Sequence, residues 1–139
     1  MVTACLVLGA GVVLDAGEKP GEAYQAAMKD LGAASAALRK HVQEIEAAGA
    51  YPDYNPIEKD VAALKGPLKT ALSFWTAKHA DDAVTQAQTA LTSIDELETA
   101  RKEKNYDALM TASANIGKTC GACHTAHREK LPDGSYEIK

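Results

Sequence analysis

The residues best suited to chemistry stand together near the end of the chain. Cys120-Gly121-Ala122-Cys123-His124 is the pattern C-x-x-C-H. On a helix, positions i and i+3 share one face, so both thiols are within reach of the two vinyl groups at one edge of a porphyrin. Two thioethers would fix the ring, and the adjacent imidazole would bind its iron from the proximal side. The pattern therefore predicts one covalently attached haem c per chain.

Other uses of two cysteines and a histidine fit this sequence less well. A structural zinc site needs four ligands, and no second C-x-x-C or paired histidine occurs elsewhere in the sequence. A thioredoxin-type pair opens a helix after a strand, whereas this pair falls late in a helical stretch. A disulfide between positions i and i+3 of a helix is geometrically awkward. A haem-free helical protein with a redox dithiol remains as a hypothesis from another class.

The composition indicates an all-helical domain. The chain has 139 residues, of which 46% are hydrophobic, 24% charged and 5% aromatic. Alanine, the best helix former, is abundant, and the β-branched and aromatic runs typical of strands are absent. The net charge of −4 argues against a nucleic-acid partner. Scattered Lys and Arg residues argue against an electrostatic membrane anchor, and no catalytic triad, paired-carboxylate motif or phosphate loop points to an enzyme.

The start of the chain resembles a secretion signal. Residues 4–14 form an uncharged apolar run that is too short to span a bilayer as a helix. Small residues follow it, as they do near a signal cleavage site. We interpret residues 1–16 as a signal segment, with an N-terminal strand or core helix as the alternative. This interpretation predicts a periplasmic protein and leaves residues 17–139 as a single haem-binding domain without a membrane span.

Four amphipathic segments follow, starting at about residues 21, 55, 81 and 105. The first runs to residue 48 and the last to about residue 130, and Asn55, Asp81 and Asn105 are the expected caps of the last three. Gly66-Pro67 predicts a kink or break in the second segment. The apolar seam of the first has heptad-like spacing: Met28, Leu31, Ser35, Leu38, Val42 and Ile45. Such segments with short connections predict an antiparallel four-helix bundle.

A four-helix chain with C-x-x-C-H near its C-terminal end resembles the cytochrome c′ family. The resemblance is best around Cys120, Cys123 and His124 and spans roughly residues 20–130. It implies that His124 is the iron ligand and that Arg128, one turn later, lies beside the proximal imidazole. The alternative for Arg128 is a solvated cation at a helix C-terminus.

The family places its distal residue early in the first helix, and Met28 matches by position. Three interpretations of Met28 stay open: an axial ligand, a cover over a five-coordinate iron, or an ordinary core residue. Many members carry an Arg one turn earlier, where this chain has Tyr24. Tyr24, Gln25 or Lys29 would then have to contact the haem propionates.

Other candidate residues have simpler interpretations. Trp75 is expected either to flank the haem or to belong to the core. His127 is expected near the haem, where a packing or edge position is favoured over a role in contact with the iron ligand. We expect His41 and His79 to be exposed.

The function predicted from all these features is one-electron transfer with unknown redox partners. The alternative is binding of nitric oxide or carbon monoxide at a five-coordinate iron. Members of the family often form homodimers through their early helices.

Overall fold

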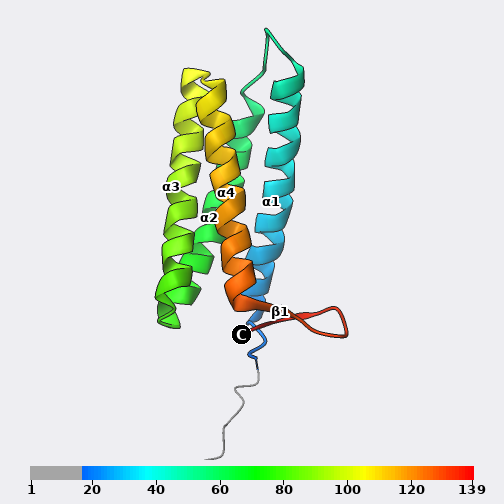
Figure 1. Cartoon of the computed structure of the whole chain (residues 1–139), viewed down its shortest axis with the longest axis vertical. Helices are drawn as coiled ribbons and strands as arrows, with labels where there is room; N and C mark the ends of the chain where they lie inside the picture. The colour runs from blue at the N-terminus through cyan, green and yellow to red at the C-terminus, as the bar shows by residue number, and fades with distance from the viewer. Residues whose placement is uncertain (1–16) are drawn as a thin grey trace, which may run out of the picture.

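A computed structural model describes residues 17–139, so the predicted signal segment, residues 1–16, lies outside the described part. Four antiparallel helices form a bundle with short connections, which confirms the predicted fold class (Figure 1). Within residues 17–139, none of the helices has the length and apolar character needed to cross a membrane. The elements in chain order are α1 (Glu22–Ala47), α2 (Pro56–Ala77), α3 (Asp81–Glu103), α4 (Tyr106–His127), β1 (Arg128–Lys130) and β2 (Tyr136–Ile138).

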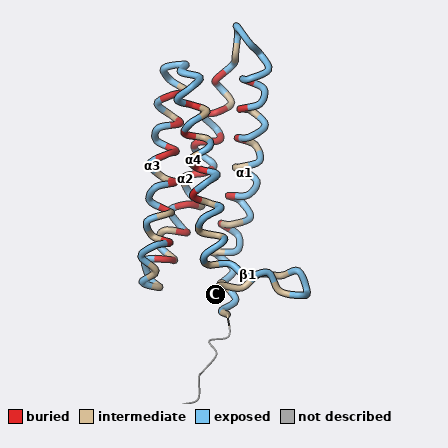
Figure 2. Tube along the Cα trace, viewed as in Figure 1, coloured by how far each residue is buried: buried red, intermediate tan, exposed pale blue. Residues whose placement is uncertain are grey.

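The core runs along the inner faces of all four helices (Figure 2). In α1 the buried stripe is Ala27, Leu31, Ala34, Leu38, Val42 and Ile45. Met28 and Ser35, both expected in the seam, are only half-buried. They lie at the edge of the stripe, because neighbouring alanines take the inward positions. The predicted seam is therefore confirmed at four positions and shifted at two, and one of those two is the candidate distal residue.

Of the kink or break predicted at Gly66-Pro67, the break is wrong, because α2 continues through Pro67. Proline removes the hydrogen bond that its backbone nitrogen would donate to the carbonyl of Ala63. Ala63 is exposed, so water can take the place of that donor. Leu64 and Leu68, on either side of the proline, are 0% and 4% exposed. Packing of these leucines holds the helix together across the missing bond.

The caps agree with the sequence only in part. The side chain of Asn105 accepts a hydrogen bond of 3.1 Å from the backbone nitrogen of Ala108, which confirms the cap of α4. Asn55 makes no side-chain cap bond, and Pro56 occupies the first turn of α2 instead. α3 begins with Asp81 inside the helix, so that residue is not its cap. Where helix propensity and packing already define a start, no side-chain cap is required.

The end of α4 differs from the prediction. The helix stops at His127 rather than near residue 130, and the chain turns back as a hairpin of β1 and β2. Gly134 has φ +86°, a left-handed conformation that favours glycine, and the backbone nitrogen of Leu131 donates to Ser135 O at 2.8 Å. Glu18 pairs with Ile138, which adds the segment before α1 to the hairpin. The composition gave no indication of these strands, since they are only three residues long.

Contacts between the helices are uneven. α1 packs closely on α2, α2 on α3, and α3 on α4, whereas α1 and α4 contact each other only sparsely. Small residues line both sides of this seam, with Gly32 and Ser35 on α1 and Ser113 and Gly117 on α4. The hairpin lies at the end of the bundle where α4 finishes and α1 begins (Figure 1). The bundle therefore has one open seam, and the C-x-x-C-H residues lie at its hairpin end.

Candidate functional site

Cys120, Cys123 and His124 lie in the last two turns of α4, and all three are half-buried. They face hollows on the α1 side of the helix. A cavity of about 380 Å³ is lined by Cys123 and His124, and one of about 460 Å³ between α1 and α4 is lined by Cys120 and His124. A narrow space of about 40 Å³ touches both cysteines. Met28 lines all three hollows, as does His124, so these two residues face a shared space from opposite helices.

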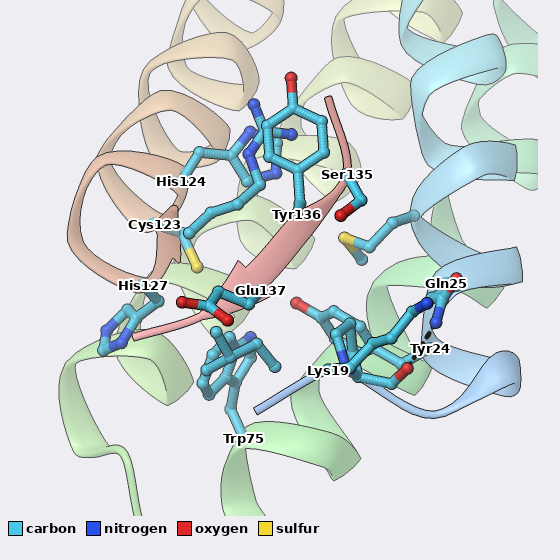
Figure 3. Close-up of a pocket in the computed structure, with 14 residues that line it drawn as sticks. Lys19, Tyr24, Gln25, Trp75, Cys123, His124, His127, Ser135, Tyr136 and Glu137 are labelled. Atoms are coloured by element: carbon cyan, nitrogen blue, oxygen red, sulfur yellow. Dashed lines mark hydrogen bonds between the residues drawn. The ribbon is translucent and has the colours of Figure 1, made fainter. Parts of the chain in front are cut away.

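An aromatic group forms one wall of the first cavity (Figure 3). Trp75 is 4% exposed, and its ring centroid lies 6.0 Å from that of Tyr24 and 4.8 Å from that of His127. Phe74 packs on Tyr24 with a centroid distance of 4.0 Å. Trp75 is therefore both a core residue and a wall of the site, so the two interpretations of it agree. The wall supplies the flat apolar surface that a planar ring system needs.

Burial sets the protonation states at the site. It raises the pKa of both thiols, with the neighbouring Cys120 thiol a smaller cause at Cys123. It lowers the pKa of His124, and the Arg128 guanidinium lowers it further. His124 is therefore neutral at pH 7, which is the form that binds metals. A reactive redox dithiol needs a lowered thiol pKa, which is the opposite of what Cys120 and Cys123 have.

Two basic residues near His124, Arg128 and His127, have different partners. Arg128 lines the first cavity, and its Cζ lies 4.1 Å from the centroid of the Tyr136 ring. His127 Nε2 lies 2.8 Å from Asp82 Oδ2, which joins the end of α4 to the start of α3. His127 also touches Trp75, so it has the packing role that was favoured for it. Of the two, Arg128 influences the imidazole of His124 electrostatically.

The candidate contacts for propionates divide into two groups. Tyr24 and Gln25 line the first cavity, whereas Lys29 lines none of the described cavities. Burial is the main cause that raises the pKa of Tyr24 to about 12, so the phenol stays neutral. Gln25 Nε2 donates a 2.6 Å hydrogen bond to Pro20 O. Lys19, which the sequence reasoning missed, also lines the cavity, because the segment before α1 runs along the hairpin.

Several hairpin residues at the site had no recognisable signal in the sequence. Ser135, Tyr136, Glu137 and Ile138 all line the first cavity. The turn residues 131–134 predicted only that the helix stops. Nothing in a three-residue strand shows that it folds back onto the helix it has just left. Tyr136 is 41% exposed and contacts Arg128, and no pattern in the sequence predicts this contact.

The expectation for His41 is wrong, and that for His79 is confirmed. His79 is exposed and has φ +56° in the turn after α2. The side chain of His41 is only 23% exposed, and its Nδ1 lies 2.7 Å from Asp60 Oδ2 on α2. The side chain of Asp60 is 5% exposed. The sequence gave no sign that an aspartate would be buried, so the polar pair across α1 and α2 was not predicted.

The residues present suit a c-type haem. Two thiols separated by one helical turn and an adjacent neutral imidazole face an apolar space, and these are the groups that such a haem requires. Within residues 17–139, no group of three or more His, Cys, Asp or Glu side chains is arranged to hold a metal ion by itself. The site therefore resembles a haem attachment site more than a bare metal site.

Comparison with solved structures agrees with the architecture. Cytochrome c′ from Rubrivivax gelatinosus shares 17% identity, with 79% of this chain and 97% of that chain covered and a TM-score of 0.59. A ferrous cytochrome c′ variant from Alcaligenes xylosoxidans with bound nitric oxide shares 20% identity, with 87% and 97% covered and a TM-score of 0.61. A nitric oxide complex of another mutant of that protein gives 20% identity, 86% and 99% covered and a TM-score of 0.52.

No protein-family model and no curated protein matches the chain. The structural likeness nevertheless extends over nearly the whole length of each solved cytochrome. At such low identity the structural likeness supports the arrangement of the helices. The roles of the individual site residues are argued from their chemistry. The chain has the four-helix-bundle fold of the cytochromes c′.

Proposed function

We propose that the protein is a c-type cytochrome that carries one covalent haem per chain and transfers single electrons in the periplasm. One observation carries this proposal: Cys120, Cys123 and His124 share one end of α4 and face an apolar space that Met28 closes from α1. A haem bound there would supply the exchange between ferrous and ferric iron. The bundle buries and orients it, which is the work of an electron carrier rather than of an enzyme.

Each residue has a defined part in this proposal. Cys120 and Cys123 would form the thioethers, and neutral His124 would bind the iron on the proximal side. Met28 lies on the facing helix and would either bind the iron as a thioether ligand or cover it. Trp75 and Tyr24, which line the cavity, would pack against the haem and help to exclude water from it.

The second candidate is a gas-binding protein. Two of the solved structures with this fold are described with bound nitric oxide. A five-coordinate iron under Met28 would leave a position for nitric oxide or carbon monoxide, and a half-buried methionine can rotate away from such a ligand. The haem-free dithiol is disfavoured, because burial raises the pKa of both thiols.

Maturation in a bacterial host with a c-type haem attachment system tests the proposal. We expect the mass of the purified chain to increase by that of one haem and the visible spectrum to show a Soret band. As the control, a double variant with Ala in place of Cys120 and Cys123 should lose covalent haem attachment and keep the helical fold. A low-spin spectrum supports the carrier, and a high-spin spectrum that shifts with carbon monoxide supports the gas binder. A colourless wild-type chain of unmodified mass contradicts both.

A further inference from the structure

α4 ends one residue before Arg128. Arg128 has extended backbone angles, φ −125° and ψ 130°, and is the first residue of β1. Had the helix continued, its side chain would lie one turn beyond His124 on the same face. Arg128 nevertheless lines the same cavity as His124. Helix geometry does not bring the guanidinium there, so another contact must fix its position.

That contact is the ring of Tyr136. Arg128 Cζ lies 4.1 Å from the ring centroid, within the range of a cation–π interaction. In the hairpin Arg128 is opposite Ile138, and Tyr136 is opposite Lys130, so Arg128 and Tyr136 are diagonal neighbours on one face. Among residues 17–139, no carboxylate forms a salt bridge with Arg128. The aromatic ring is therefore the contact that orients this cation.

The strand that carries Tyr136 is fastened on both sides. Glu18 N donates to Ile138 O at 3.0 Å, and Ile138 N donates to Glu18 O at 2.8 Å. On the other side β2 pairs with β1. Ile138 also packs against the group that contains Tyr24 and Trp75. The ring of Tyr136 is thus presented by a strand tied to the beginning of α1, to the end of α4 and to the wall of the cavity (Figure 3).

We infer that Tyr136 is a positioning residue that holds the positive charge of Arg128 beside the imidazole of His124. The C-terminal hairpin thereby places a cation that the helix itself does not place. This inference rests on the proposed function, since it concerns the ligand of a haem iron. It adds a residue that neither the C-x-x-C-H pattern nor the bundle fold identifies.

The electrostatic consequence has a definite sign. Ferric haem carries one more positive charge than ferrous haem, so a nearby cation disfavours the ferric state and raises the midpoint potential. Arg128 is exposed in the hairpin, so solvent already screens part of its charge. An arginine that the ring does not hold near the cavity would be screened more and would have a smaller effect. Loss of the Tyr136 ring should therefore lower the potential in the same direction as loss of the Arg128 charge.

The test uses the haem-loaded protein, after its mass has shown that the haem is attached. Tyr136→Leu removes the aromatic face but keeps apolar bulk, and Tyr136→Phe keeps the face. Arg128→Gln removes the charge, and Tyr51→Leu, in the loop at the far end of the bundle, is the control because Tyr51 is 92% exposed. Midpoint potentials are measured by spectroelectrochemical titration at low ionic strength. Tyr136→Gln is a second variant that lacks the ring. Thermal melting followed by circular dichroism shows that each variant is folded.

We expect Arg128→Gln to lower the midpoint potential. Tyr136→Leu and Tyr136→Gln should reproduce most of that decrease. Tyr136→Phe and Tyr51→Leu should keep the wild-type potential. In Arg128→Gln, adding Tyr136→Leu should change nothing further. A wild-type potential in both ring-deleted variants, or decreases that add fully in the double variant, would overturn the inference. So would a wild-type potential in Arg128→Gln. Failure of the proposed function is distinguishable, because it is seen in the wild-type chain as the absence of attached haem.

Discussion

His41 Nδ1 and Asp60 Oδ2 lie 2.7 Å apart and join α1 to α2 within the bundle. The carboxylate side chain is 5% exposed, so His41 provides the partner that makes its burial tolerable. This polar pair lies on the helices that also carry Met28 and Trp75, and it fixes how those two helices are aligned.

Removal of His41 should therefore destabilise the protein strongly. His41→Leu leaves the carboxylate of Asp60 buried without its partner, and we expect a loss of roughly 2 to 4 kcal/mol in the free energy of unfolding. Replacing both residues by Leu should cost less than the two single changes together. Urea unfolding measures all three variants, and strict additivity would contradict a coupled pair.

Asn105 offers a test of the cap of α4. Asn105→Ala removes the acceptor for the backbone nitrogen of Ala108, and we expect a loss of about 1 kcal/mol. Asn55→Ala is the matched control, since Asn55 makes no side-chain cap bond at α2. Thermal melts followed by circular dichroism compare the two. Equal losses in both variants would show that the cap bond contributes nothing specific.

Glu98 predicts a dependence of stability on pH. Its carboxylate accepts two hydrogen bonds of 2.8 Å from Arg101, the main cause that lowers its pKa from 4.5 to about 2. A pKa lowered in the folded state stabilises the fold above the unfolded value, and this stabilisation is lost as the pH falls from about 4.5 towards 2. Glu98→Gln should therefore lose about 1 kcal/mol or less at pH 7, since the pair is partly exposed.

The same comparison at low pH supplies the check. The difference in unfolding free energy between Glu98→Gln and wild type should disappear near pH 2, where the wild-type carboxylate also becomes neutral. Glu103→Gln, at the exposed end of α3, controls for the change in net charge. A difference that stays constant from pH 7 to pH 2 would be inconsistent with an ionic contribution from Glu98.

Met28 distinguishes the two proposed haem functions. If Met28 is the iron ligand, we expect Met28→Ala to convert the low-spin spectrum of the haem-loaded protein to high-spin, because the variant lacks the thioether sulfur. Met110→Ala is the control, since Met110 packs against the core of α4 and lines none of the described cavities. An unchanged visible spectrum in Met28→Ala would exclude Met28 as an iron ligand.

The bundle could be predicted from the sequence because its signals are local and repeated. Leu31, Leu38, Val42 and Ile45 recur with helical spacing, and burial follows from that period. That Cys120, Cys123 and His124 lie together on α4 was also predictable, because a fixed spacing on one helix determines which groups share a face. These features depend on neighbours in the sequence, and the structure confirms the helices that hold them.

Features that depend on distant contacts were not predictable. Pro67 signalled a break, but packing of the leucines beside it keeps α2 continuous. Tyr136 reaches Arg128 only because the chain reverses after α4 and pairs with Glu18. His41 is half-buried because Asp60 faces it from another helix. Each of these outcomes is decided by a partner far along the chain, which one-dimensional patterns do not record.

The sparse contact between α1 and α4 has a consequence for how the proposed haem would enter the bundle. Three of the four interfaces between neighbouring helices are closely packed, so they stay assembled if α1 rotates slightly about its contact with α2. The sparsest interface of the bundle therefore borders the hollow where the proposed haem would lie, and such a group could enter there without disrupting the packed interior that α2, α3 and α4 share.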